Sequence, residues 1–450
     1  MLRRIGRGVF ALAASRAGTL VVANLAMTAL GVTAGVISAR ALGPAGRGDL
    51  AVLLYWPSFV YSVVDCAVME IATLRVAQRP EGLRAHLKGG LAAALLFSIV
   101  GLAVGYLALP LLLRPEQGPL LADARWFLAY VPVALLAFVP QGALLGLQMF
   151  RSVAALRLST SALYLAGVVA VAVTGHASAS TFAWLAVASL AAQLPIGLAL
   201  LAGRLAHAER GGPLELAGRI KDGVHLQGAR IANVLGANVD RALASLTLSQ
   251  TNIGLYQVPV MISQVFPVLP QALAELLFSQ LAAANEGERA ALTRTAYVRA
   301  LMLSTLVAVS AASTLWFVVP LLYGASFGAA VAPATIVAFG GVVNGGALVL
   351  KSASRAAMCV RPCVEAEAVG ISTTAVLGPW LAARYGLVGL AWSYAAGRAV
   401  CAAWMVARVP RDVSGGWRGL TPLSSAFRGE VALALRLLGA RLFAAPGNAG

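Results

Sequence analysis

The feature that most constrains the fold is a series of apolar runs, each about 20 residues long, that recurs along the chain. A transmembrane helix needs about 20 apolar residues, whereas a transmembrane strand needs about ten alternating ones. Only 11% of the residues are charged and the mean hydropathy is +0.82, so polar side chains cannot cover the surface. The sequence therefore predicts an all-α polytopic membrane protein.

Twelve such runs are long enough to be spans, and a polar segment at 204–222 separates them into two sets of six. The predicted spans are 18–40, 49–71, 89–112, 126–148, 153–174, 181–203, 225–248, 254–280, 298–322, 331–350, 364–383 and 387–407. We expect an N-terminal six-helix lobe at 1–211, a C-terminal six-helix lobe at 212–411 and a basic cytoplasmic tail at 412–450.

The basic residues predict the orientation of these spans. With the N-terminus placed inside, the segments predicted to face the cytoplasm carry 26 of the 34 Lys and Arg residues, Arg157 among them. The external segments carry five, and Arg230, Arg241 and Arg398 lie within spans. Because Lys and Arg are retained on the cytoplasmic side, both termini are predicted to be cytoplasmic. This bias accounts for the net charge of +17, so we expect no nucleic-acid partner.

The two halves of the sequence also resemble each other. Gly48 after the first span aligns with Gly254 after the seventh, at an offset of 206 residues. Pro110 aligns with Pro320 and Gly142 with Gly346, at offsets of 210 and 204. Both halves begin inside and hold six spans, which predicts a parallel repeat about an axis along the membrane normal.

Three arginines are the first candidates for a binding site. An unpaired charge near the middle of a bilayer costs about 2.5–3.5 kcal/mol, so such residues normally face a protein interior or a wet cavity. Arg230, Arg241 and Arg398 are candidates to hold a diphosphate, because guanidinium offers a fixed fork of donors to phosphate oxygens. The alternative is that they form structural salt bridges between helices.

Other polar residues in the spans extend this candidate site. Asn233 lies on the polar face of the seventh span, Tyr61 shares a predicted face with Asp65, and Gln257, Gln264 and Gln271 recur every seven residues. Amides suit sugar hydroxyls because they both donate and accept hydrogen bonds, although interhelical bonding explains them equally well. The acidic candidates for ion coupling are Asp65, Asp240 and Glu275.

Metal and cofactor chemistry is not expected. The histidines are dispersed without metal-ligand spacing, and Cys66, Cys359, Cys363 and Cys401 are scattered over spans and one short loop. We interpret the cysteines as packing residues and predict no metal, no cofactor and no catalytic residue.

Three motifs connect the chain to a known family. They are Arg40-Ala-Leu-Gly-Pro-Ala-Gly-Arg-Gly-Asp-Leu50, Asp240-Arg241 followed by Ile253-Gly-Leu-Tyr256, and Pro320-Leu-Leu-Tyr-Gly-Ala-Ser-Phe327. In these motifs, over roughly residues 1–411, the chain resembles the O-antigen and exopolysaccharide repeat-unit flippases of the multidrug/oligosaccharidyl-lipid/polysaccharide exporter superfamily. The resemblance implies two six-helix lobes forming a V around a cationic cavity, alternating access, and a polyprenyl-diphosphate-linked oligosaccharide as substrate.

The functional expectation is therefore a flippase of the cytoplasmic (inner) membrane in polysaccharide or lipopolysaccharide biosynthesis, not an enzyme. Membrane lipids and the polysaccharide polymerase machinery are the further partners that this implies. A MATE-like, cation-coupled drug antiporter is an alternative, although its cavity should be acidic and aromatic rather than rich in arginine. A membrane-embedded glycan polymerase or ligase is a weaker alternative, because every predicted external connection is short.

Overall fold

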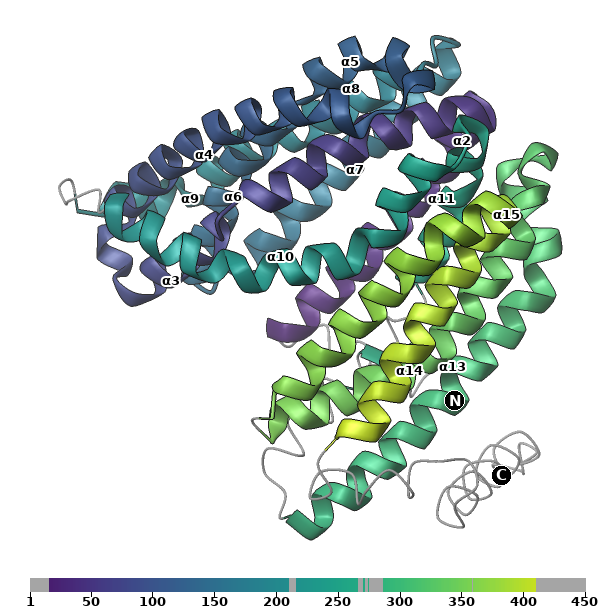
Figure 1. Ribbon diagram of the computed structural model, residues 1–450. Coiled ribbons are helices and arrows are strands. Elements are labelled where there is room, and N and C mark those ends of the chain that lie inside the picture. The colour runs from purple at the N-terminus through teal and green to yellow at the C-terminus, as the bar shows by residue number, and fades with distance from the viewer. Residues whose placement is uncertain are drawn as a thin grey trace, which may run out of the picture. The chain divides into compact units, whose positions relative to one another are not determined.

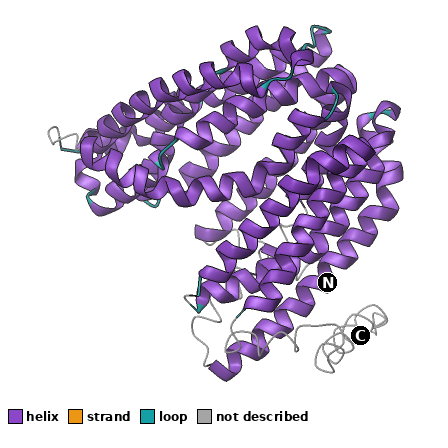
Figure 2. Cartoon of the chain, in the orientation of Figure 1, coloured by secondary structure: helices purple, strands orange, loops and turns teal. Residues whose placement is uncertain are grey.

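The computed structural model describes residues 16–209, 216–265, 270–271, 274, 286–357 and 359–409. Within these ranges the chain consists of helices joined by short turns, and Figure 2 draws no strand there. The all-α prediction is confirmed. Arg230 and Asn233 lie on a described helix, but their side chains are outside the described part, and Glu275 is outside it altogether.

The helices before residue 210 and the one that follows are labelled in Figure 1. They are α2 (Arg16–Val64), α3 (Val68–Gln78), α4 (Leu83–Leu112), α5 (Leu121–Phe127), α6 (Tyr130–Gly146), α7 (Phe150–Thr174), α8 (Ala179–Ala191), α9 (Gln193–His207) and α10 (Leu216–Thr247). Short 3-10 turns, Pro80–Gly82 and Pro115–Leu120, precede α4 and α5.

The remaining helices are α11 (Gln250–Val265), α13 (Glu286–Tyr323), α14 (Val331–Ala356) and α15 (Arg361–Arg408). A 3-10 turn, Ala325–Ala330, leads into α14. Within the described residues, seven helical stretches are long and apolar enough to cross a membrane: Val22–Val64, Pro80–Leu112, Pro115–Gly146, Phe150–Thr174, Ala179–His207, Glu288–Tyr323 and Ala325–Ala356. The number of twelve spans stays a prediction.

Two glycines with positive φ interrupt the longest helices. Gly43 in α2 has a φ of 68° and Gly386 in α15 has a φ of 56°, a region that glycine occupies without steric cost. Gly43 falls between the first two predicted spans and Gly386 between the last two. Each of these long helices is therefore two helical segments meeting at a glycine, at the boundaries that the sequence predicted.

Contacts divide the chain into two compact units. The N-terminal unit comprises Met1–Leu235 and Ser249–Gly254, and the C-terminal unit comprises Gly236–Leu248 and Leu255–Gly450. The division runs through α10, which gives its first part to one unit and its last part to the other. It does not coincide with the polar segment before α10.

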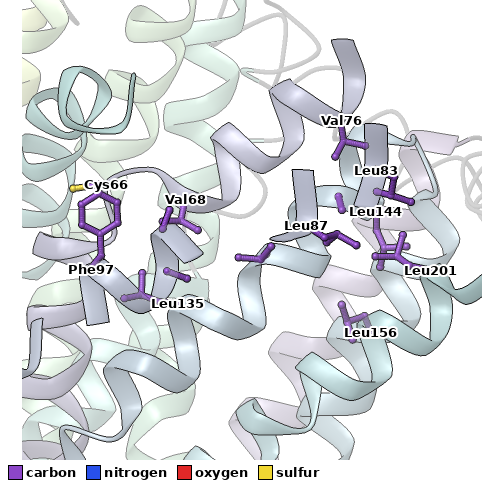
Figure 3. Packing of buried hydrophobic residues seen from close by; sticks show 14 of the residues in the cluster. Cys66, Val68, Val76, Leu83, Leu87, Phe97, Leu135, Leu144, Leu156 and Leu201 are labelled. Atoms are coloured by element: carbon purple, nitrogen blue, oxygen red, sulfur yellow. The ribbon is translucent and has the colours of Figure 1, made fainter. Parts of the chain in front are cut away.

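The core of the N-terminal unit forms where α3, α4, α6, α7 and α9 pack together (Figure 3). Its labelled members are Cys66, Val68, Val76, Leu83, Leu87, Phe97, Leu135, Leu144, Leu156 and Leu201. Small residues let the helices approach: a Cβ on Gly146 of α6 would lie only 2.6 Å from the carbonyl oxygen of Thr73 in α3. Such close packing is how helices associate where lipid removes the hydrophobic drive between them. In the C-terminal unit, α13, α14 and α15 pack around Ala300, Leu350 and Met405.

The second predicted span is broken, which corrects the expectation of one helix over 49–71. Helix α2 ends at Val64 and α3 begins at Val68, and between them Cys66 and Ala67 have φ values of 42° and 54°. The Oδ1 atom of Asp65 accepts the N–H of Ala67 at 3.2 Å, and the carbonyl of Asp65 accepts the N–H of Val68 at 3.0 Å. Asp65 thus stabilises the start of α3.

Helix α10 completes this break from the other side. The last carbonyl groups of a helix have no partner within the helix, and the amide Nε2 of Gln227 donates to the carbonyl oxygens of Ser62 at 3.1 Å and Val63 at 2.6 Å. Gly223 lies against the break, where a Cβ would stand 2.5 Å from the carbonyl oxygen of Cys66. The break is therefore built by residues about 160 positions apart.

The repeat motifs meet at what we call the glycine crossing, formed by Pro44, Gly48, Gln250 and Gly254 within the N-terminal unit. A Cβ on Gly48 would overlap the carbonyl oxygen of Gln250, and a Cβ on Gly254 would overlap that of Pro44. At the offset of 206, Gly48 corresponds to Gly254 and Pro44 to Gln250. The contact is therefore reciprocal between equivalent positions, which supports the predicted alignment of the two halves.

Candidate functional site

Arg398 is held by a charged group in the C-terminal unit. Its Nη1 lies 3.6 Å from Oε2 of Glu367, and its Nη2 donates to the carbonyl oxygen of Gly236 at 3.2 Å. Lys351 of α14 forms an ion pair with the same glutamate. The guanidinium also lies 5.5 Å from the ring centroid of Tyr394. Two cations share the carboxylate of Glu367, and the charge of Asp240 also acts on Arg398. Arg398 in addition joins α15 to α10.

Asp240 and Arg241 are neighbours with different surroundings. Asp240 is buried, and the hydroxyl of Tyr256 donates to its Oδ2 at 3.4 Å. Arg241 is half-buried, and its Nη1 donates to Oδ1 of Asn238 at 3.3 Å. Among the described residues, no carboxylate forms a direct ion pair with Arg241, although the charge of Asp240 acts on both Arg241 and Arg398. Arg241 therefore keeps donors that an anionic ligand can use.

The predicted glutamines are spread along and beyond α11. Gln257 is half-buried in α11, whereas Gln264 near its end and Gln271 beyond it are exposed. Gln264 and Gln271 are thus more exposed than Gln257. Their role, like those of Arg230, Asn233 and Glu275, stays a prediction.

Asp65 and Tyr61, predicted to share one helical face, are separated by the break after Val64. Asp65 is buried and its carboxylate accepts the N–H of Ala67 in the turn before α3, so it does not lie on the face of a continuous helix. Tyr61 remains in α2 and lines a cavity of about 310 Å³ in the N-terminal unit. The full lining consists of Met27, Tyr61, Met69, Phe138, Gln141, Arg157, Thr160, Ser161 and Gln193.

Sequence reasoning missed the cation of this cavity. Arg157 was counted with a cytoplasmic segment, but it lies two turns into α7, which begins at Phe150. The signal was present, because Arg157 falls inside the predicted span 153–174. What the sequence did not show is that α2, α6 and α9 bring Tyr61, Gln141 and Gln193 to the same cavity.

Long apolar helices with charged and amide side chains among them define a multi-pass helical membrane protein. The chain belongs to the polysaccharide biosynthesis protein family, whose model matches residues 14–278. A sequence search of curated proteins finds no match.

Solved transporters share this fold. A MATE family multidrug transporter of the MOP superfamily, in an inward-facing conformation, aligns with a TM-score of 0.67 and 15% identity over 93% of this chain and 96% of its own. The lipid II flippase MurJ, in an inward closed conformation, aligns with a TM-score of 0.69 and 13% identity over 94% and 98%. A MOP superfamily transporter from Pyrococcus furiosus, described as having a binding pocket of reverse polarity, aligns with a TM-score of 0.57 and 14% identity. The alignment covers 90% of this chain and 98% of that transporter.

These similarities bear on the alternatives set out from the sequence. The similar structures are transporters and a flippase, and the family is named for polysaccharide biosynthesis. At such low identity the structures establish the fold alone, so the choice between a lipid-linked glycan and a drug as substrate depends on the family and on the residues of this chain.

Proposed function

We propose that the protein translocates polyprenyl-diphosphate-linked oligosaccharide repeat units across the cytoplasmic membrane by alternating access. The observation that carries the proposal is membership of the polysaccharide biosynthesis protein family in a chain with a transporter fold. A glycan made on a lipid carrier inside the cell has to reach the outer face before it is built into a polymer. The polysaccharide polymerase machinery would then receive the product.

The cationic residues within the helices fit a diphosphate headgroup. Arg241 makes no direct ion pair with a described carboxylate, and three cations, Arg241, Arg398 and Lys351, lie near only two acidic groups, Asp240 and Glu367. Arg230 is the third cation assigned to this role. Gln257, Gln264, Gln271, Asn233 and Tyr61 are assigned to sugar hydroxyls. Asp240 and Glu275 remain candidates for ion coupling, whereas Asp65 is engaged at the break before α3.

Transport by the purified protein in liposomes tests this function. A short oligosaccharide on a polyprenyl diphosphate is placed in the bilayer, and its appearance on the far leaflet is followed with an impermeant sugar-modifying enzyme. Arg241→Ala should nearly abolish transport, and Arg241→Lys should weaken it because Lys lacks the planar fork. Arg384→Ala is the matched control, since Arg384 is exposed and lies over the Trp380 ring.

The transport activity of Arg398→Ala has to be corrected for the amount of folded protein, because this substitution also removes the contact with Glu367. Transport that survives Ala at Arg230, Arg241 and Arg398 together would remove the cationic-cavity mechanism. Transport of a cationic dye by a protein that leaves the lipid-linked glycan unmoved would favour the antiporter.

The same proposal fixes an orientation, with both termini in the cytoplasm and lobes at 1–211 and 212–411. Single cysteines in a background without the native four should label from outside only in the external connections. These are near Pro115, Gly175, Asn252, Ser326 and Tyr385. Positions near Arg84, Arg210, Glu286 and Arg361 should be protected, and external labelling at Arg210 would overturn the two-lobe topology.

A further inference from the structure

The cavity of the N-terminal unit, which we call the Arg157 pocket, holds a cation without a counter-charge. Its lining residues are those named above, from Met27 to Gln193. Arg157 is half-buried, and its guanidinium makes no hydrogen bond or ion pair with any residue that the structure describes. A charge inside a membrane span normally pairs with a protein group or with a ligand. Arg157 therefore leaves a place for an anion.

Two buried amides in the same pocket are also short of partners. The Oε1 atom of Gln193 is buried without a hydrogen bond, in a side chain that is 6% exposed. The Nε2 atom of Gln141 donates to the Sδ atom of Met69 at 3.0 Å, and a thioether is a weak acceptor. Buried polar groups in proteins are nearly always bonded. These amides thus provide one acceptor and a poorly used donor for hydroxyl groups.

The rest of the wall is apolar and partly aromatic. Tyr61 and Phe138 stand with their ring centroids 5.7 Å apart, and Met27 and Met69 complete this side. A pyranose ring presents C–H groups on its faces and hydroxyls around its edge, so it matches a pocket with an aromatic wall and amide groups. The volume of about 310 Å³ is at the small end for ligand sites, which suits a single sugar residue.

We propose that the Arg157 pocket binds one acidic sugar residue, with its carboxylate on Arg157 and its hydroxyls on Gln141 and Gln193. Water can satisfy the amides but leaves the charge of Arg157 without a counter-ion, which is why an anionic sugar fits better than a neutral one. The inference rests on the proposed function in one respect: the acidic sugar belongs to the glycan that is carried. It narrows the substrate class to repeat units that contain a uronic acid.

Binding to the purified full-length protein tests the pocket without any transport step. Titration with methyl glucuronide, followed by saturation-transfer NMR, should show saturable binding. Methyl glucoside, its neutral counterpart, should bind at least tenfold more weakly. Arg157→Gln should reduce the affinity for the glucuronide at least tenfold, whereas Arg151→Gln, an exposed arginine at the start of the same helix, should leave it unchanged.

Gln193→Leu provides a second variant that keeps every charge and nearly the same volume. This variant should lower the affinity for both sugars several-fold. It tests the pocket even if the Arg157→Gln variant cannot be obtained in folded form. Equal binding of glucuronide and glucoside, or glucuronide binding that survives both Arg157→Gln and Gln193→Leu, would overturn the proposal. So would inorganic phosphate or phosphatidylglycerol in nanodiscs competing as well as the glucuronide, because the pocket would then be a general anion or lipid-headgroup site.

Binding and transport separate the two proposals. If the glucuronide binds through Arg157 while no lipid-linked glycan is moved, the pocket stands and the flippase function fails. If glycans are moved but neither sugar binds, the pocket assignment fails and the function stands.

Discussion

Replacing Gly254 with alanine perturbs the glycine crossing at its closest approach. The new Cβ would lie 2.8 Å from the carbonyl carbon of Pro44 and 2.9 Å from the amide nitrogen of Gly48, and it would overlap the Pro44 oxygen. All three atoms are backbone, so no side chain can rotate away. The two segments would have to separate by at least about 0.6 Å before the carbonyl carbon reached ordinary contact at 3.4 Å.

Overpacking of this kind costs roughly 1–3 kcal/mol. For a unit of 241 residues, that corresponds to a fall in melting temperature of roughly 2–12 °C. Membrane proteins often unfold irreversibly, so the measurement is the temperature at which half of the protein stays monodisperse after a fixed heating time in detergent. Gly48→Ala should cost a similar amount, because its Cβ would lie 2.9 Å from the carbonyl carbon of Gln250.

Gly31→Ala is the matched control. Gly31 is exposed in the same helix, α2, and a Cβ there meets nothing within 4 Å. Alanine is favoured over glycine within a helix by about 0.5–1 kcal/mol, so this variant should be as stable as the parent or slightly more so. The double variant Gly48→Ala/Gly254→Ala should cost less than the sum of the two, because one separation relieves both overlaps. If the Gly254→Ala variant were as stable as the Gly31→Ala variant, the close backbone contact at the glycine crossing would be refuted.

Three further outcomes follow from the polar contacts. Asp65→Ala should lower stability by about 1–3 kcal/mol because the buried N–H of Ala67 loses its acceptor, whereas Asp65→Asn keeps an acceptor oxygen and should lie near the parent in the same heating assay. Gln227→Leu leaves two helix-end carbonyls without their donor and should cost about 1–3 kcal/mol; protease accessibility at the break should rise with it. Glu367→Gln removes the carboxylate shared by Lys351 and Arg398 and should cost about 3–5 kcal/mol, visible as a loss of monodisperse protein, and an unchanged profile would mean that the ion pairs do not form.

The helical architecture followed from local information. Apolar runs of span length became helices, and Gly43 and Gly386 took the positive φ that their predicted places between spans require. The break at 65–67 could not be predicted in this way. Cys66 and Ala67 have no intrinsic preference for left-handed backbone. The carboxylate of Asp65 accepts the N–H of Ala67 there, and Gln227, a residue far along the chain, bonds the end of α2 just before them.

The candidate site was predictable only as a set of residue types. That Arg241 and Arg398 are costly to bury is visible from the sequence, but the pairing of Arg398 with Glu367 joins residues 31 positions apart within α15. The residues of the Arg157 pocket could be recognised as neighbours only after five separate helices, α2, α3, α6, α7 and α9, had been placed. The Arg398–Glu367 pair and the Arg157 pocket both depend on how the chain packs over long distances in the sequence. The spacing of residues along one helix carries no information about such packing.

Because α10 contributes residues to both units, the N-terminal unit is complete only after α10 has been synthesised. The N-terminal unit includes Leu216–Leu235 and Ser249–Gly254, which supply Gln227 to the break and Gly254 to the glycine crossing. A ribosome that has inserted the first six predicted spans has therefore not yet delivered the parts that complete this unit. The carbonyls of Ser62 and Val63 therefore lack their donor until Gln227 has been synthesised, and the glycine crossing cannot form until Gly254 has.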